Sequence, residues 1–166
     1  MAGVGVGLGL GRCGGRTPDE LATLAADARS DGVHIVPAYN GLGAPWWDPD
    51  ARGLLIGITH DTRPAHLVRA ALESLAWQTR DVVEEMAAVT GLPMRRLRVD
   101  GGACANDVLM QMQADVLAMP VERPALIEST ALGAAAMAGL GAGLWDLDFL
   151  ERHRPVDRCF LPSGSD

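Results

Sequence analysis

The sequence predicts an α/β fold, in which helices are layered against a sheet that is largely parallel. Short apolar runs that suit β-strands alternate along the chain with longer segments of helical periodicity. The longest of these segments, residues 60–91, carries apolar or small side chains at the spacing of a buried helical stripe. Residues 97–107 run from an apolar strand through two glycines into a helix, the order found at a strand-to-helix turn of an open α/β sheet.

Size, composition and charge limit the classes of protein to which the chain can belong. Its 166 residues are enough for one domain with a hydrophobic core, and 48% hydrophobic against 21% charged residues indicates a folded chain. The net charge of −7 argues against binding to nucleic acid or to an anionic membrane. No apolar run reaches the length of a membrane span. Three widely spaced cysteines without a CxxC pair predict neither a disulfide framework nor a zinc site, and they favour a reducing, cytoplasmic location.

The glycine-rich, low-complexity stretch over residues 1–16 is not expected to build a packed element. Gly9, Gly11 and Gly14 formally satisfy a GxGxxG pattern, but no strand precedes them, so the pattern does not indicate a nucleotide loop. The folded domain is expected over residues 17–162. Its first helix should begin with Thr17 as the N-cap and Pro18 in the first turn.

Local signals predict the next three elements. Apolar runs at residues 33–39 and 53–59 predict strands. The second run is apolar on both faces, so we expect it to be covered on both. The helix over residues 60–91 has Thr62 available as a cap and ends at Gly91.

The second half of the chain continues the alternation with a strand at 97–100, a helix from 106 and a strand at 121–124. A helix over residues 128–145 is rich in alanine and glycine, which should let it lie very close to a neighbouring element. The tail from residue 146 is polar and contains two prolines, and no strand or helix is assigned to it.

The segment most informative about function is LRVDGGACAND, residues 97–107. Gly101 and Gly102 follow Asp100 at the end of a predicted strand, where ligands of α/β proteins bind, and their lack of side chains would let a ligand approach the main chain. Asn106 is the natural N-cap of the next helix, and its amide can both donate and accept, which suits a purine or a ribose. The same residues also fit a plain turn with a capping asparagine, and residue types alone leave both interpretations open.

A second unusual segment is NGLGAPWWDPDARG, residues 40–53, which places Trp46 and Trp47 side by side in a chain with only 4% aromatic residues. Adjacent residues cannot both point to one face of a strand. We therefore expect this loop to face a cleft or a second domain. The alternative is that one ring covers the core while the other is exposed.

Three further features have simpler structural explanations. His66, early in a helix, is expected to cap or pack rather than to catalyse. Cys104 is expected to be a packing residue, although a helix start can activate a thiol. The acids of the DPD segment and Asp61 match no metal-binding loop, so the sequence predicts no catalytic and no metal-ligating residue.

Four motifs, in order, resemble those of the FGGY carbohydrate kinases, and of glycerol kinases in particular. NGLGAPWWDPDARG is similar to GLGAPYWDPxARG, and GLLIGITHDTRPAHLVRAALE follows the second FGGY signature. RVDGGACAND resembles RVDGGAxAN, and ESTALGAA resembles ETTALGAA. The resemblance covers residues 33–145 and points to the C-terminal domain of such a kinase.

The resemblance implies an actin-like, ribonuclease-H-like α/β domain, with a mixed sheet flanked by helices, that binds ATP or ADP. Carried over by motif, Gly102 would contact the nucleotide through its main chain and Asn106 would hold the adenosine end, while Asp100 and Gly101 would shape the turn. The whole enzyme would convert ATP and glycerol to ADP and sn-glycerol 3-phosphate. Mg²⁺ would be held mainly by the nucleotide and by another domain.

Some functional parts of such an enzyme have no counterpart in this sequence. The family's substrate-binding residues, catalytic aspartate and phosphate loop belong to an N-terminal domain that this sequence does not contain, so we expect a fragment that is inactive alone. Ala2-Gly3 echoes a family AGxxVQWL helix, but Gly7-Leu8 stand where that helix has Gln-Trp. The alternatives are a non-catalytic nucleotide-binding remnant and the matching part of another polyol or sugar kinase. The expected partners are a nucleotide, the missing N-terminal domain and, through exposed core surface, further copies of the chain.

Overall fold

The computed structural model describes residues 18–152 and 155–164 and divides into two compact units, one ending at Leu75 and the other beginning at Ala76. The glycine-rich stretch, its GxGxxG pattern, the Ala2-Gly3 echo, Cys13 and the Thr17 cap lie outside the described residues. The predicted element order from the first helix to the alanine-rich helix is confirmed. No helix in the described segments has both the length and the apolar character needed to cross a membrane.

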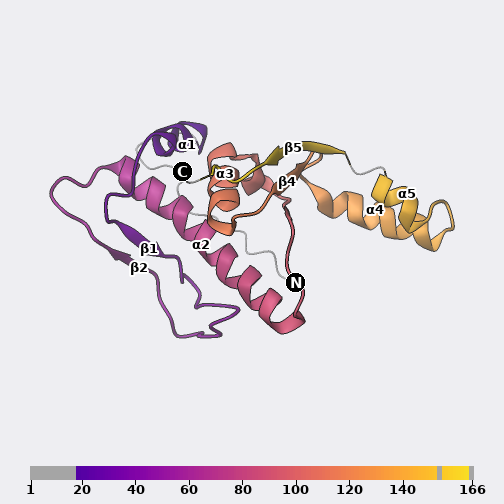
Figure 1. The fold of residues 1–166 in the computed structure, drawn as a ribbon, viewed down its shortest axis with the longest axis horizontal. Coiled ribbons are helices and arrows are strands. Elements are labelled where there is room, and N and C mark those ends of the chain that lie inside the picture. The colour runs from indigo at the N-terminus through magenta and orange to yellow at the C-terminus, as the bar shows by residue number, and fades with distance from the viewer. Residues whose placement is uncertain (1–17, 153–154, 165–166) are drawn as a thin grey trace. The chain divides into compact units, whose positions relative to one another are not determined.

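The first unit contains a two-stranded antiparallel sheet and two helical segments (Figure 1). The sheet pairs His34 with Ile56 and Val36 with Leu54. Its elements are α1 (Pro18–Ala26), β1 (His34–Val36), β2 (Leu54–Ile56) and the first part of α2 (Pro64–Thr90). The core of this unit consists of small and branched side chains: Ala25, Val33, Ala38, Val68, Ala70, Ala71 and Leu72.

The expectation that β2 is covered on both faces is wrong for this chain. Leu54, Leu55 and Ile56 are 51%, 44% and 57% exposed, so both faces of the strand are open. An apolar strand is typical of a buried sheet because burying its side chains is favourable. The sequence pattern therefore indicates a covered strand, but the described residues of this chain do not cover it.

The long helix α2 has the predicted buried stripe but a different N-terminal cap. Val68 and Val83 are buried, whereas Met86, which the same spacing places on the stripe, is 50% exposed. Thr62 does not cap the helix, because its hydroxyl accepts from the Thr59 amide in the preceding turn, at 2.8 Å. Instead, His66 Nδ1 accepts a long hydrogen bond of 3.4 Å from the Arg63 amide, which confirms a capping role for this histidine.

The second unit contains the rest of α2 and a three-stranded sheet in the order β3-β4-β5. β3 runs parallel to β4, and β5 runs antiparallel to β4, so the sheet is mixed, as the predicted fold class requires. Helix α3 packs against β4 and β5 (Figure 1). The elements of this unit are β3 (Leu97–Arg98), η2 (Gly102–Ala105), α3 (Asp107–Leu117), β4 (Val121–Pro124), α4 (Ser129–Gly141), α5 (Leu147–Arg152) and β5 (Val156–Phe160).

The tail contains a helix and a strand where none was assigned. Helix α5 occupies residues 147–152, and β5 places Phe160 opposite Val121 with only 2% of Phe160 exposed. The alternation in VDRCF is the pattern of a half-buried strand, but the flanking prolines and charged residues masked it. A partner strand more than thirty residues earlier decides this element, which a local pattern cannot show.

Helix α4 ends at Gly141, earlier than predicted, and its close neighbour is the chain that follows it. Only Gly139 is buried in this helix, and a Cβ at that position would lie 2.0 Å from the Trp145 ring. The Trp145 indole donates to the Ala136 carbonyl at 3.0 Å. Met137 on the same helix is 70% exposed.

An ion pair network joins β3 to β4 and makes the stability of the domain depend on pH. Arg96 and Arg98 donate to the two carboxylate oxygens of Glu122 at 2.8 and 3.2 Å. The hydrogen bond from Arg96, and then that from Arg98, hold the pKa of Glu122 below its ordinary value of 4.5 against the effect of burial. A depressed carboxyl pKa stabilises the fold above the ordinary pKa, and this contribution is lost as the pH falls through the folded-state value.

We expect Glu122→Gln to lower the free energy of unfolding at pH 7 by about 1 kcal/mol or less, since both arginines are half exposed and screened by solvent. The difference from the parent should shrink as the pH falls from 4.5 through the lower pKa that Glu122 has in the folded state. Urea denaturation at a series of pH values measures both effects. Glu84→Gln, which removes an exposed pair with Arg80 within α2, is the control and should cost less. A Glu122→Gln deficit that stays constant down to acidic pH would contradict the assignment.

Candidate functional site

The turn that follows β3 is held by main-chain bonds to the adjacent strand and to the segment before α4. The Val99 amide donates to the Glu122 carbonyl at 3.1 Å, and the Gly101 amide donates to the Ile127 carbonyl at 2.6 Å. Gly101 has a φ of 81°, which favours glycine because a side chain would be strained there. The Asp100 carboxylate accepts a short hydrogen bond from the Ser129 hydroxyl. The carboxyl end of β3 is thus tied to the start of α4.

The outer side of this turn is open. A Cβ built on Gly101 or on Gly102 would meet no atom within 4 Å, and Gly102 and Ala103 are both exposed. No side chain therefore plugs the turn, and a ligand can approach its main chain directly. This is the accessibility that the glycine pair predicts.

Asn106 caps α3 and keeps one hydrogen-bonding group available. Its side-chain oxygen accepts from the Leu109 amide at 3.1 Å, and the preceding residues form the short helix η2. Within the described part of the chain, the Asn106 amide nitrogen has no hydrogen-bond partner. The capping interpretation is thus correct, and it leaves the NH₂ group of the same side chain able to donate to a ligand.

Cys104 lies inside the same turn but is not a reactive thiol. It is 1% exposed, and burial raises its pKa, an effect that the charge of Arg123 only partly offsets. A buried thiol with a raised pKa is a poor nucleophile. The prediction of a packing residue is confirmed.

Two residues that contact the predicted site were not identified from the sequence. Ser129 orients Asp100, and Arg123 on β4 donates to the Cys104 carbonyl at 3.1 Å. Ser129 belongs to the ESTALGAA motif and Arg123 to the strand predicted at residues 121–124, but their contacts with the turn cross more than fifteen residues of sequence. The one available signal was an arginine in the middle of a short predicted strand.

Both tryptophan rings in the loop before β2 are exposed: Trp46 by 63% and Trp47 by 75%. The alternative that one ring covers the core is therefore wrong. The loop is held from within, because the Asp48 carboxylate accepts from the Asp50 and Ala51 amides at 2.9 and 3.0 Å. The Asp48 carboxylate thus holds the turn of this loop.

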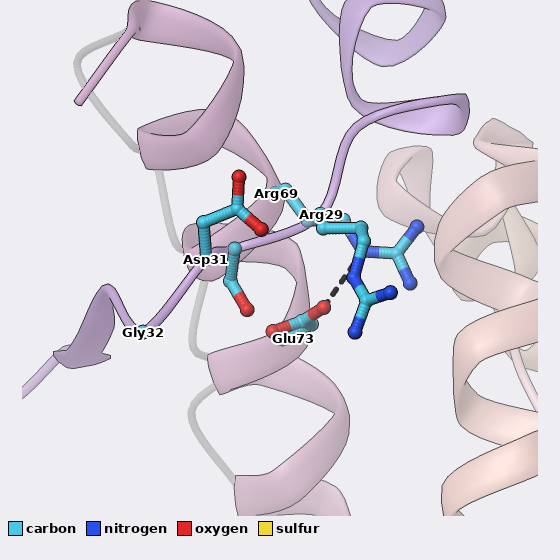
Figure 2. A pocket seen from close by; sticks show the side chains of 6 residues that line it. Arg29, Asp31, Gly32, Arg69 and Glu73 are labelled. Carbon is cyan, nitrogen blue, oxygen red and sulfur yellow. Dashed lines mark hydrogen bonds and ion pairs between the residues drawn. The ribbon is translucent and has the colours of Figure 1, made fainter. Parts of the chain in front are cut away.

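A charged surface recess of about 330 Å³ lies in the first unit and contains none of the predicted site residues (Figure 2). Arg69 Nε bonds Glu73 at 2.7 Å within it, and Arg69 also donates to the Ala25 carbonyl at 3.3 Å. The bond from Arg69 on α2 to the end of α1 shows that the residues of the recess help to pack these two helices together. No group of three or more His, Cys, Asp or Glu side chains among the described residues is arranged to hold a metal ion.

Comparison with known proteins places the chain in a family. Residues 12–142 match the C-terminal domain of the FGGY family of carbohydrate kinases. A glycerol kinase of Gloeobacter violaceus is 56% identical over 146 residues, which are 87% of this chain and 29% of that protein. A glycerol kinase of Shewanella woodyi is 51% identical over 138 residues, which are 82% of this chain and 28% of that protein. The chain thus spans less than a third of the length of these relatives.

Solved structures show the same relation. The crystal structure of Plasmodium falciparum glycerol kinase with ADP matches with a TM-score of 0.79 at 36% identity, covering 90% of this chain and 30% of that one. A gluconate kinase from Lactobacillus acidophilus matches with a TM-score of 0.76 at 25% identity, covering 89% of this chain and 30% of that one. The mixed sheet with flanking helices is therefore the fold of these kinases. The chain belongs to the FGGY family of carbohydrate kinases and corresponds to its C-terminal domain.

Proposed function

We propose that the turn formed by Asp100, Gly101, Gly102 and Asn106 is the adenine-nucleotide site of a glycerol kinase, within a nucleotide-binding domain that spans residues 17–162. The observation that carries the proposal is the open main chain of Gly102 at the end of a parallel strand, next to an asparagine amide with a free donor. The similarity to a glycerol kinase crystallised with ADP supports the choice of nucleotide.

Each residue has a part in this proposal. Gly102 admits the nucleotide against its main chain, and the Asn106 NH₂ donates to an acceptor of the adenosine. Asp100, held by Ser129, and Gly101 fix the shape of the turn. These groups bind and orient the nucleotide, which is the main protein contribution to phosphoryl transfer.

The matched relatives are more than three times as long as the matched region, and we infer that their other parts carry out the rest of the reaction. We infer that the whole kinase transfers the γ-phosphoryl group of ATP to glycerol, giving sn-glycerol 3-phosphate and ADP. Mg²⁺ would be bound by the phosphates, by water and by the rest of the enzyme, since Mg²⁺ commonly uses few protein ligands. The free thiols of Cys104 and Cys159 suit a reducing cytoplasm.

The exposed apolar surface of the first unit gives the proposed partner a place to dock. Leu54, Ile56 and both loop tryptophans are more than half exposed. Surface of this kind is typical of an interface that burial stabilises. We propose that the part of the kinase that this chain lacks covers it, and that the isolated chain self-associates through it.

Replacing Asn106 tests the nucleotide site directly. We expect the parent chain to bind ADP weakly, and Asn106→Ala to lower the affinity about 10-fold or more, because the amide donor is lost. The same change removes the N-cap and should lower the free energy of unfolding by about 1 kcal/mol. Isothermal titration with ADP and urea denaturation measure the two effects.

Asn106→Ser separates capping from binding. Serine caps a helix about as well as asparagine but has no amide to present to adenosine. We expect this variant to keep the stability of the parent and to bind ADP as poorly as Asn106→Ala. A parent that fails to bind ADP, or an Asn106→Ser variant that binds as tightly as the parent, would overturn the proposal.

A further inference from the structure

Arg123 on β4 contacts the main chain and the carboxylates on either side of Asn106. It donates to the Cys104 carbonyl at 3.1 Å and bonds the Asp107 carboxylate at 2.6 Å. The Ala105 carbonyl lies 3.5 Å from the same nitrogen, at the limit of a hydrogen bond. One guanidinium group therefore bonds to the chain on both sides of Asn106.

The rest of the Arg123 side chain is equally constrained. Its Nε donates to Asp157 on β5 at 2.8 Å, and its guanidinium lies 5.3 Å from the centre of the Phe160 ring. Only 13% of the side chain is exposed. The hydrogen bond to Asp107, followed by that to Asp157, raises the pKa of Arg123 above its already high value, so the group stays charged at every pH at which the protein folds.

The guanidinium group of arginine is suited to these contacts because it is planar and has several N–H donors. The last carbonyls of a short helix have no partners within the helix, and a buried carbonyl without one is costly. Arginine can satisfy such a carbonyl while it pairs with carboxylates in other directions, whereas the single ammonium of lysine cannot reach all three groups. Arg123 thereby connects strand β4 to the junction between η2 and α3.

We propose that Arg123 is a positioning residue for the nucleotide site, which fixes the main chain around Asn106 from strand β4 and so sets the direction of the amide that the ligand meets. This inference rests on the proposed function, but the order of the turn that it predicts can be measured without a nucleotide. Arg123 itself does not contact the ligand, because its guanidinium is directed to the carbonyl of Cys104 and to Asp107 and Asp157.

Arg123→Met and Arg158→Met form a matched pair for the test. Arg158 also bonds Asp107, at 2.5 Å, and also lies over Phe160, at 4.6 Å, but it donates to neither carbonyl of the turn. In the full chain, we expect Arg123→Met to speed amide hydrogen exchange at Asn106 and Met110 about 10-fold or more relative to Val83 in α2. The reason is that the loss of the charge-assisted hydrogen bonds of Arg123 would make local opening of the turn easier. Arg158→Met should change these ratios less than about 2-fold, since an exposed pair contributes little.

Titration with ADP adds a second measurement. Arg123→Met should weaken ADP binding about 10-fold, and Arg158→Met should leave it unchanged. If Arg123→Met does not fold, Arg123→Lys tests the positioning role instead. We expect this variant to be nearly as stable as the parent but to show faster amide exchange at Asn106. Equal effects of the two methionine variants, or a lysine variant that exchanges like the parent, would overturn the positioning role. Failure of the parent chain to bind ADP would overturn the proposed function. The exchange data would still show whether Arg123 orders the turn.

Discussion

Gly57→Ala should cost the domain at least about 3 kcal/mol of unfolding free energy, a large share of the stability of a typical domain. Gly57 has a φ of 86°, a conformation that strains any residue with a side chain. A Cβ at this position would lie 1.9 Å from the Gly32 carbonyl oxygen and 3.2 Å from the Val33 Cα. Both contacts are with main chain, so no flexible side chain can move aside. Relief would require the ends of β1 and β2 to separate.

Gly53→Ala is the matched control for this prediction. It lies in the same hairpin, but its Cβ would be 3.5 Å from the Val36 carbonyl oxygen, an ordinary contact. We expect its unfolding free energy to stay within about 1 kcal/mol of the parent. Urea denaturation followed by circular dichroism compares the two variants. If they prove equally stable, the close approach of Gly57 to Gly32 does not exist in solution.

Gly102→Val should lower the affinity for ADP at least 10-fold, or about 1.4 kcal/mol, while the domain keeps its fold. The valine side chain would project into the open space in front of the turn, where no protein atom lies within 4 Å of its Cβ. The protein therefore has nothing to rearrange, and the branched side chain should cost about 1 kcal/mol of stability or less. The nucleotide, in contrast, would lose its approach to the main chain.

The control for Gly102→Val is Gly133→Val in α4, where a Cβ also meets nothing within 4 Å. Both variants replace an accessible glycine by the same side chain, but only one lies at the proposed site. Isothermal titration with ADP should show weakened binding for Gly102→Val alone. An affinity equal to that of the parent would place the nucleotide elsewhere, and a large loss of stability would show that the turn is not open.

Local signals predicted the parts of this protein whose interactions are local. The stripe through Val68 and Val83 produced α2, because residues three and four apart share one face of a helix. The turn at Gly101 and Gly102 followed from the absence of side chains, and Asn106 capped α3 through a bond to a residue three positions later.

Contacts between distant residues determined the rest. Strand β5 exists because Phe160 pairs with Val121, and Arg123 reaches the turn from a neighbouring strand. The sequence of β2 predicted a covered strand, but only the structure could show that β2 is exposed in the part of the chain that it describes. The amino-acid sequence by itself determined the helices, the order of the elements and the open turn at Gly102, since these depend on periodicity, backbone freedom and hydrogen bonds between near neighbours. Only the tertiary structure decided which strands pair and which side chain supports Asn106, because those interactions join residues that the chain separates widely.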